Sequence, residues 1–257
     1  MLADLMAGAA ADAADRERLK PLEAVRAEAL ARPAAIDALA ALAPSDRVKI
    51  IAEVKRASPS RGDLAEIRDP AQLAVSYETG GASTISVLTE GRKFKGSLAD
   101  LEEVRRSVAL PVLRKDFISS PYQVYEARAA GADLVLLIVA ALDDDATLAS
   151  LYALITELGM TALVETHSEE ELHRALALGA QLVGVNARNL STFELDRDLF
   201  GTLAPQIPAG VIRVAESAVL SPADVRHYRE AGADVVLIGE ALVTGDPVAT
   251  LAEYLAV

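Results

Sequence analysis

The chain of 257 residues contains no cysteine and no tryptophan, and only three histidines. Without cysteine there can be no disulfide and no thiolate metal site, so the chain can fold in a reducing compartment. The histidines at positions 167, 173 and 227 are too scattered to predict a metal-binding cluster. We therefore expect no disulfide, no thiolate metal site and no metal site built on clustered histidines.

Positive charge and long apolar runs are also scarce. The 25 lysines and arginines are outnumbered by 38 aspartates and glutamates, and the net charge of -13 argues against a nucleic-acid-binding surface. The longest apolar runs, such as residues 134–142, are too short to cross a bilayer as a helix, and the acidic amino terminus does not resemble a signal peptide. We expect a cytoplasmic protein with no membrane or nucleic-acid partner, in which a local cationic pocket attracts any anionic ligand.

Four similar segments recur along the chain. In each, Gly-Ala ends a helical pattern and a β-branched or leucine-rich run follows, which is typical of a helix-to-strand junction. Buried strands that alternate with amphipathic helices predict a parallel sheet covered on both faces. Eight such units in this length predict a closed (β/α)8 TIM barrel of the α/β class. The four segments begin at Gly81, Gly131, Gly179 and Gly232, and further strands are expected at 49–55, 111–115, 161–165 and 211–215.

Residues 1–47 precede the first predicted strand. Residues 1–20 and 21–31 have amphipathic helical patterns, with Pro21 and Pro33 as boundaries. No linker or low-complexity run clearly separates them from the rest. We expect one barrel domain, residues 1–257, with residues 1–47 as a helical extension packed on it.

Polar side chains follow six of the eight predicted strands. The carboxyl ends of barrel strands meet at one rim, where barrel enzymes carry their catalytic groups. A hydrophobic core needs no such groups, and buried charges are costly unless they are paired or used. Glu53 and Lys55 share one face of the first strand, and a purely structural ion pair remains an alternative for them. The rim candidates in chain order are Glu53, Lys55, Lys115, Glu165, Asn186, Arg188, Glu216, Ser217, Gly239 and Glu240.

The ends of the last two strands predict a phosphate site. Barrels of this kind commonly hold a phosphate there with backbone N–H groups and the start of a helix. Ser217 and the turn at Gly239 and Glu240 fit that role. The alternative is that Ser217 only caps a helix and that Gly239 only allows tight packing.

Six segments, in order and in matching register, closely resemble the indole-3-glycerol phosphate synthase family. The resemblance extends from about residue 1 to the last strand. At one position the chain departs from the pattern, because the family usually has glycine after the Glu-Ser pair and this chain has Ala218. The six segments are 51–60 (IAEVKRASPS), 86–90 (SVLTE), 94–96 (FKG), 113–117 (LRKDF), 185–190 (VNARNL) and 215–217 (AES).

The resemblance implies a ring closure in tryptophan biosynthesis that uses no cofactor and no metal. The substrate would be 1-(2-carboxyphenylamino)-1-deoxyribulose 5-phosphate, and the products indole-3-glycerol phosphate, carbon dioxide and water. A ring carbon attacks a ketone, so an acid must stabilise the forming alkoxide, and Lys115 resembles the acid of the family. Glu165 resembles the base, while Glu53 and Lys55 resemble the pair that assists dehydration. The division of the base role between the two glutamates stays open, and Asn186 would hydrogen-bond the developing hydroxyl or fix Glu53.

The other expected contacts are with the carboxylate, ring and phosphate of this small substrate. Arg188, with Lys55, is expected to hold the carboxylate, because a guanidinium gives planar, bidentate contacts. Phe94 and Phe117 are expected to stack on the ring, with ordinary core packing as the alternative. Contacts with other tryptophan-pathway enzymes are left open. We also place Glu216 and Ser217 among the catalytic residues, and Ser58, Ser217, Ala218, Gly239 and Glu240 at the phosphate.

Two positions need separate interpretation. His167 follows Glu165 by two residues, but a histidine at the start of a helix is expected to be a solvent-facing cap, so we do not count it as catalytic. At position 218 alanine keeps the backbone N–H but resists a positive φ. Because the other motifs are intact, we expect Ala218 to have a negative φ and to direct its N–H at the phosphate.

Three other interpretations compete with this one. A Schiff-base aldolase on the same barrel would use Lys115 as a nucleophilic amine. A related sugar-phosphate isomerase of the pathway would usually need a cysteine or another base on the first strand, where this chain has Glu53 and Lys55. A non-catalytic barrel for binding or assembly is compatible with the fold, but the complete set of rim charges argues against it.

Overall fold

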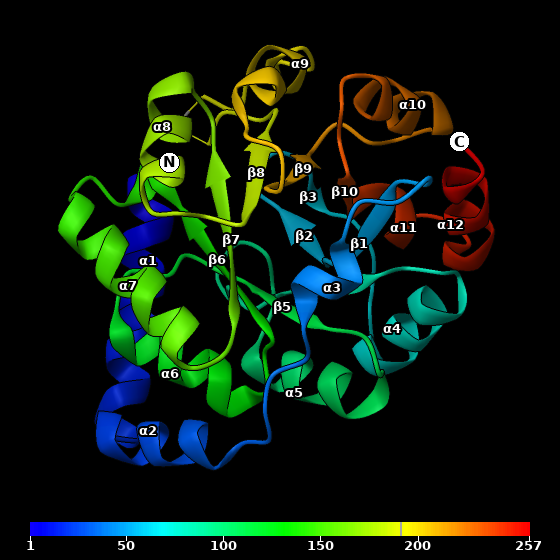
Figure 1. The fold of residues 1–257 in the computed structure, drawn as a ribbon. Coiled ribbons are helices and arrows are strands. Elements are labelled where there is room, and N and C mark those ends of the chain that lie inside the picture. Colours follow the sequence, from blue (N-terminus) through cyan, green and yellow to red (C-terminus); the bar gives the residue numbers. More distant parts are fainter. Residues whose placement is uncertain (191) are drawn as a thin grey trace.

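The structure, a computed structural model, describes residues 1–190 and 192–257. Eight parallel strands in these residues close into a barrel, because β1 hydrogen-bonds with both β4 and β10 (Figure 1). The predicted TIM barrel is confirmed. Its strands are β1 (Lys49–Val54), β4 (Thr84–Leu88), β5 (Val112–Lys115), β6 (Leu134–Ile138), β7 (Thr161–Thr166), β8 (Leu182–Asn186), β9 (Ile212–Glu216) and β10 (Val235–Ile238).

Helices on the outside of the barrel connect the strands, and local signals define where they begin. The side chains of Ser97, Ser120 and Ser168 each accept a hydrogen bond from the backbone N–H three residues later. Gly131, with a φ of 96°, ends one of these helices in the left-handed conformation. The helices are α4 (Pro70–Thr79), α5 (Leu98–Ser107), α6 (Pro121–Ala130), α7 (Asp145–Glu157), α8 (Glu169–Ala177), α9 (Leu199–Leu203), α10 (Pro222–Glu230), α11 (Glu240–Val243) and α12 (Pro247–Leu255), with single 3₁₀ turns at Val139–Ala141 and Ala204–Gln206.

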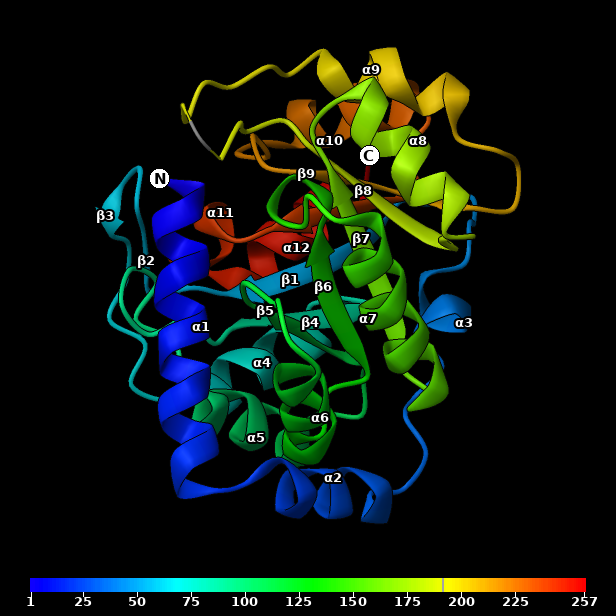
Figure 2. The same cartoon turned by 90° about the vertical axis from the view of Figure 1, so that its left-hand side faces the viewer.

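Three helices precede the barrel. They are α1 (Leu2–Leu19), α2 (Leu22–Ala31) and α3 (Ala38–Leu42), and the two helical patterns predicted there are confirmed. Helix α1 runs across the end of the barrel where the strands terminate, and α2 packs against α6 (Figure 2). Helix α3 closes the opposite end, where Ala38 and Leu42 join the apolar cluster inside the barrel.

Strand side chains alternate between two apolar layers. In β6, Leu134, Leu136 and Ile138 belong to the cluster inside the barrel, while Val135 and Leu137 belong to the layer between strands and helices. This is the two-residue period of a strand with both faces buried. The inner layer ends in charged groups at the carboxyl ends of the strands, so the strands direct the polar side chains of the rim into the barrel.

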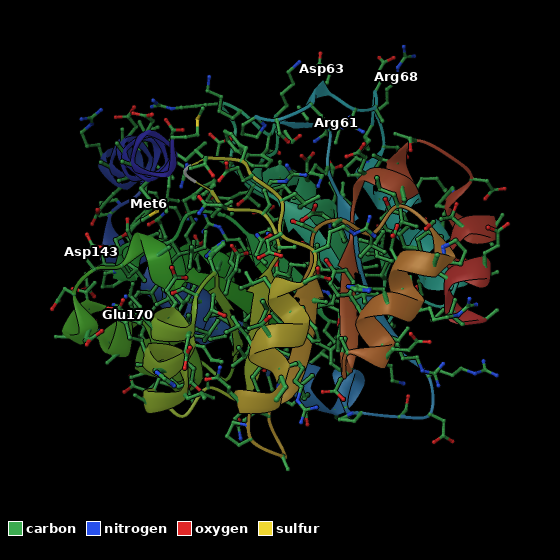
Figure 3. The ribbon with its side chains drawn as sticks, turned by 90° about the horizontal axis from the view of Figure 1, so that it is seen from above. Met6, Arg61, Asp63, Arg68, Asp143 and Glu170 are labelled. Carbon is green, nitrogen blue, oxygen red and sulfur yellow. The ribbon has the colours of Figure 1, made fainter. Side chains whose placement is uncertain are left out.

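A short antiparallel hairpin, β2 (Ala57–Ser58) and β3 (Gly62–Asp63), follows β1. The sequence pattern did not predict it. It lies at the same end of the barrel as α1, and Figure 3 shows Arg61 and Asp63 projecting from it. Its position places the Ser-Pro-Ser segment beside the carboxyl ends of the strands. Across the described residues, we find no helix that combines the length and the apolar character needed to span a membrane.

Candidate active site

A cavity of about 390 Å³ opens at the carboxyl ends of the strands. This volume is in the range of small-ligand sites. Leu5 of the N-terminal helix contributes to its wall. The cavity brings together all the predicted site residues, namely Glu53, Lys55, Ser58, Phe94, Lys115, Phe117, Glu165, Asn186, Arg188, Glu216, Ser217, Ala218, Gly239 and Glu240.

Glu53 and Lys55 form a close ion pair at one side of the cavity. Lys55 Nζ lies 2.8 Å from Glu53 Oε2, and only 3% of the glutamate side chain is exposed. Burial by itself would raise the pKa of Glu53, but Lys55 and Lys115 outweigh it and hold the pKa below its usual value. A Cβ at Gly239 would lie 2.5 Å from Glu53 Oε2, so this glycine makes room for the pair.

Lys115 lies between two buried carboxyl groups. Its Nζ is 3.5 Å from Oε2 of Glu165 and 3.5 Å from Oε2 of Glu216. Burial would lower the pKa of Lys115, but these carboxyl groups and Glu53 raise it above the usual lysine value. Lys115 is therefore an ammonium at neutral pH, which suits a proton donor and does not suit the free amine that a Schiff-base aldolase requires.

Asn186 and His167 both contact the same one of the two Glu165 oxygens, Asn186 by a hydrogen bond and His167 at ion-pair distance. Asn186 Nδ2 donates to Oε1 at 3.1 Å, and His167 Nε2 lies 3.2 Å from the same oxygen. Burial would raise the pKa of Glu165, but Lys115, His167 and Asn186 lower it, so the group is a carboxylate. The expectation that Asn186 fixes Glu53 is wrong: its amide reaches across from β8 to the neighbouring β7 and holds Glu165.

Glu216 has the opposite electrostatic setting. Burial raises its pKa well above the usual carboxyl value, and repulsion from Glu165 adds to this effect. Neither carboxyl oxygen has a hydrogen-bond partner within residues 1–190 and 192–257. Glu216 fits here because Gly184, between the two glutamate strands, has no side chain: a Cβ there would overlap Glu216 Oε1. The pKa values of two similar residues are thus shifted in opposite directions, which separates a base from an acid.

His167 is not the solvent-facing cap that we expected. Only 7% of its side chain is exposed, and its ring lies between Glu165 and Glu171. The cap of α8 is the next residue, Ser168, whose hydroxyl accepts a hydrogen bond from the backbone N–H of Glu171. Packing of α8 against the end of β7 buries the ring, which the local sequence pattern did not indicate.

Arg188 and the two phenylalanines line the side of the cavity nearer the loops. The Arg188 guanidinium donates to the carbonyl of Phe193 at 3.3 Å and forms no ion pair within the described part of the chain. The rings of Phe94 and Phe117 are 6.1 Å apart and tilted by 42°. Glu90, which sequence reasoning left without a role, accepts the backbone N–H groups of residues 92–94 and so fixes the loop that carries Phe94.

Ser217 and Ala218 both have a positive φ, of 71° and 58°. The expectation of a negative φ at Ala218 is therefore wrong. The turn is held by tertiary contacts: Ser217 Oγ donates to Asn186 Oδ1 at 2.7 Å, and Tyr228 donates its O–H to the Ser217 carbonyl at 3.3 Å. Ser217 does not cap the following helix, because the N-cap of α10 is Ser221.

Glu240 is the one predicted phosphate residue with a negative side chain. Arg61 Nε donates to its Oε1 at 2.9 Å, which links the β2–β3 hairpin to the end of β10 across the cavity mouth. The carboxylate is thus paired, and only the backbone N–H of Glu240 is suited to an anion. Arg61 is a cavity residue that the motif analysis did not single out, although it follows the Ser-Pro-Ser segment directly.

Taken as chemistry, the cavity offers a protonated lysine, a carboxylate beside it, a carboxyl group of raised pKa and a guanidinium that forms no ion pair within the described residues. These groups can donate a proton to a carbonyl oxygen, remove a proton from carbon and hold an anion.

The chain is similar to indole-3-glycerol phosphate synthases along nearly its whole length. The family model for indole-3-glycerol phosphate synthase matches residues 2–255. The indole-3-glycerol phosphate synthase of Leifsonia xyli subsp. xyli is 71% identical over 254 residues, which cover 99% of this chain and 97% of that protein. The one from Rhodococcus jostii is 58% identical over 248 residues, covering 96% and 91%. Among solved structures, a 3-hexulose-6-phosphate synthase has a TM-score of 0.63 at 22% identity, covers 81% of this chain and 99% of that one, and is alike in fold.

Proposed function

The chain belongs to the indole-3-glycerol phosphate synthase family, and from this premise we propose how its residues divide the reaction. The activity is the ring closure of 1-(2-carboxyphenylamino)-1-deoxy-D-ribulose 5-phosphate to indole-3-glycerol phosphate in tryptophan biosynthesis. Carbon dioxide and water are lost, so the chain is a carboxy-lyase.

We propose that Lys115 is the acid of the ring-closing step. The ring carbon that bears the carboxylate attacks the ketone, and the ketone oxygen takes a proton from Nζ as the new carbon–carbon bond forms. Carbon dioxide then leaves, and its bonding electrons restore the aromatic ring. One observation carries this assignment: Lys115 lines the cavity with its Nζ 3.5 Å from the Glu165 carboxylate, the charged group that contributes most to keeping it protonated, and 3.5 Å from Glu216.

The dehydration step needs a base and a second acid. Glu165 is the proposed base for the CH₂ proton, because its Oε2 has no hydrogen-bond partner in the described residues. Glu53 is bound to Lys55 at 2.8 Å, which supports a role in orienting that lysine as the donor to the departing hydroxyl. Glu216, whose pKa is raised by burial well above the usual carboxyl value, is a second candidate for this donor. In total, the ketone oxygen and the departing hydroxyl each take one proton and the CH₂ group gives up one. The net uptake of one proton balances the reaction, because the substrate carboxylate starts as an anion and leaves as neutral carbon dioxide.

The substrate-binding roles are proposals of the same kind. Arg188 would hold the carboxylate of the substrate, since its guanidinium has no acidic partner among the described residues. Phe94 and Phe117 would contact the ring. Asn186 would meet the developing hydroxyl while it holds Glu165. The phosphate would lie against the backbone at the ends of β9 and β10, near Ser58, Ser217, Ala218, Gly239 and Glu240.

The test of the acid assignment is Lys115→Ala. A general acid typically contributes about 10²–10⁴-fold, so kcat should fall by that factor with KM changed little. Indole fluorescence reports turnover against a low background, because the chain has no tryptophan. Lys20→Ala, a substitution at an exposed lysine in the connection between α1 and α2, is the matched control and should leave both constants unchanged. A loss under tenfold would move the acid role to Lys55.

Two broader proposals concern the setting of the enzyme. We propose that the chain works in the cytoplasm and that residues 1–47 are an extension of a single domain, as the packing of α2 on α6 supports. Contacts with other enzymes of the pathway stay an untested expectation.

A further inference from the structure

His167 lies directly behind the proposed base. Its ring Nε2 is 3.2 Å from Glu165 Oε1, and its Nδ1 is 3.1 Å from Glu171 Oε2. Glu171 also accepts the backbone N–H of His167 at 2.7 Å, so ring and backbone are bound by one residue of α8. His167 does not line the cavity, and therefore any effect on the substrate must pass through Glu165.

The two carboxylates determine the protonation of this ring. A neutral imidazole has one N–H and one lone pair, and a lone pair directed at a carboxylate oxygen would be repelled. Nδ1 is hydrogen-bonded to Glu171, and Nε2 lies 3.2 Å from Glu165 Oε1, at ion-pair distance but without hydrogen-bond geometry, so the two carboxylates favour a ring that is protonated on both nitrogens. Burial would lower the pKa of His167, but Glu165 and Glu171 raise it to about 10. His167 is thus a fixed cation at neutral pH.

This cation makes the two oxygens of Glu165 different. Oε1 accepts a hydrogen bond from the Asn186 amide at 3.1 Å and is paired electrostatically with His167 Nε2, which lies 3.2 Å away without hydrogen-bond geometry. Oε2 faces Lys115 at 3.5 Å and has no hydrogen-bond partner within the described residues. The carboxylate is therefore rotationally fixed, with one oxygen directed at the cavity.

The His167 cation also bears on which of the two glutamates beside Lys115 carries the negative charge. Lys115 is shared by Glu165 and Glu216 and can balance only one negative charge, while the Glu53–Lys55 pair is balanced in itself. Glu165 alone of the two is paired with an imidazolium. We propose that His167 is a positioning residue, which orients Glu165 and makes it, rather than Glu216, the ionised member of the pair. The inference deepens the proposed function and rests on the base role of Glu165.

The first test measures protonation directly, without activity. With only three histidines, the ring ¹⁵N signals of His167 can be assigned as those that disappear in His167→Gln. We expect the wild-type ring to be doubly protonated at pH 7 and to lose a proton only well above it. In Glu171→Gln, whose amide oxygen can still accept the backbone N–H, the proton should be lost at a pH lower by about one unit or more. A singly protonated wild-type ring at pH 7 would overturn the inference.

The second test measures kcat/KM against pH. His167→Gln keeps a hydrogen-bond donor but removes the charge, so the pKa of Glu165 should rise. Activity that needs the carboxylate is lost as pH falls through that pKa, and the acid limb should therefore move upward by about one unit or more. His167→Phe fills the volume without a donor and should also lower kcat at every pH. Folding is checked by thermal unfolding, and an unchanged acid limb in folded His167→Gln would contradict the positioning role.

Glu165→Gln separates the two proposals. If this variant kept its activity, the base assignment would fail, whereas the ring signals of His167 in the wild type would still report the ion pair. If Glu165→Gln were inactive but the His167 ring of the wild type were neutral, the base role of Glu165 would stand and the positioning role of His167 would be wrong.

Discussion

The carboxyl group of Glu216 occupies the space in which a side chain at Gly184 would begin. Gly184 is in register with Glu165 on one side and with Val214 on the other, so its missing side chain is what lets two glutamates approach the same lysine. The requirement for glycine here is steric and not conformational, because its φ is not positive.

Gly184→Ala should therefore displace Glu216 and inactivate the enzyme. We expect kcat to fall by about 10²-fold or more, the effect of losing one positioned acid–base group. Steady-state assays by indole fluorescence and thermal unfolding would measure both consequences. Gly201→Ala is the matched control, because a Cβ there meets only Ala231 at 3.7 Å, an ordinary contact. Equal activity in the two variants would refute the steric argument.

Ala218→Gly should stabilise the protein. Alanine at a φ of 58° costs about 1 kcal/mol relative to glycine, and the substitution removes this strain. For a chain of this size the melting temperature should rise by about 2–4 °C. Ala252→Gly, on the exposed face of α12, makes the same chemical change in a helix and should lower the melting temperature instead. A fall in melting temperature for Ala218→Gly would show that the turn is unstrained.

The raised pKa of Glu216 predicts a dependence of stability on pH. Above the ordinary carboxyl range the unfolded chain loses this proton while the folded chain keeps it, so the free energy of unfolding decreases as pH rises toward the folded pKa. Glutamine at this position has no such proton to lose, so Glu216→Gln removes this decrease in stability with pH. The free energy of unfolding of the variant, relative to that of the wild type, should therefore increase by up to about 1.4 kcal/mol per pH unit above pH 4.5. Urea unfolding at pH 5 and pH 7.5 measures the difference.

An exposed glutamate provides the control for that experiment. Glu230→Gln, on α10, should show no such pH-dependent gain. If the two variants responded alike to pH, the proton would not be on Glu216.

Arg188→Ala should raise KM more than it lowers kcat. A carboxylate clamp acts on the bound substrate and on the transition state alike until carbon dioxide leaves. Arg188→Lys keeps the charge but loses the bidentate geometry, so its KM should lie between the KM of the wild type and that of Arg188→Ala. Steady-state measurement of KM and kcat for the wild type, Arg188→Ala and Arg188→Lys checks this order. A collapse of kcat with unchanged KM would make Arg188 a catalytic group.

Much of the site could be predicted because it depends on local rules. The two-residue period of β1 places Glu53 and Lys55 on the inner face, and the direction of a barrel strand brings its last residues to the rim. The same rules apply to Lys115 on β5 and to Glu216 on β9. The positions of these groups therefore follow from the strand assignments alone.

What could not be predicted depends on contacts between distant segments. The role of Gly184 is visible only when Glu216 is seen beside it, and the burial of His167 results from the packing of α8. The φ of Ala218 is imposed by hydrogen bonds from Ser217 and Tyr228, which local propensity opposes. At Ala218 the tertiary contacts outweigh a local preference of about 1 kcal/mol.

The closure of the barrel between its first and last strands has a consequence for biosynthesis. Lys49 pairs with Val235, so β1 gains its second neighbour only after almost the whole chain has left the ribosome. Until then the Glu53–Lys55 pair lacks the Gly239 turn that encloses it. A domain generally folds as a unit, and contacts this distant in sequence form slowly. The newly made chain must therefore hold the first charged residues of its site unprotected until the last strand arrives, and a chain that ends before β10 cannot complete the site.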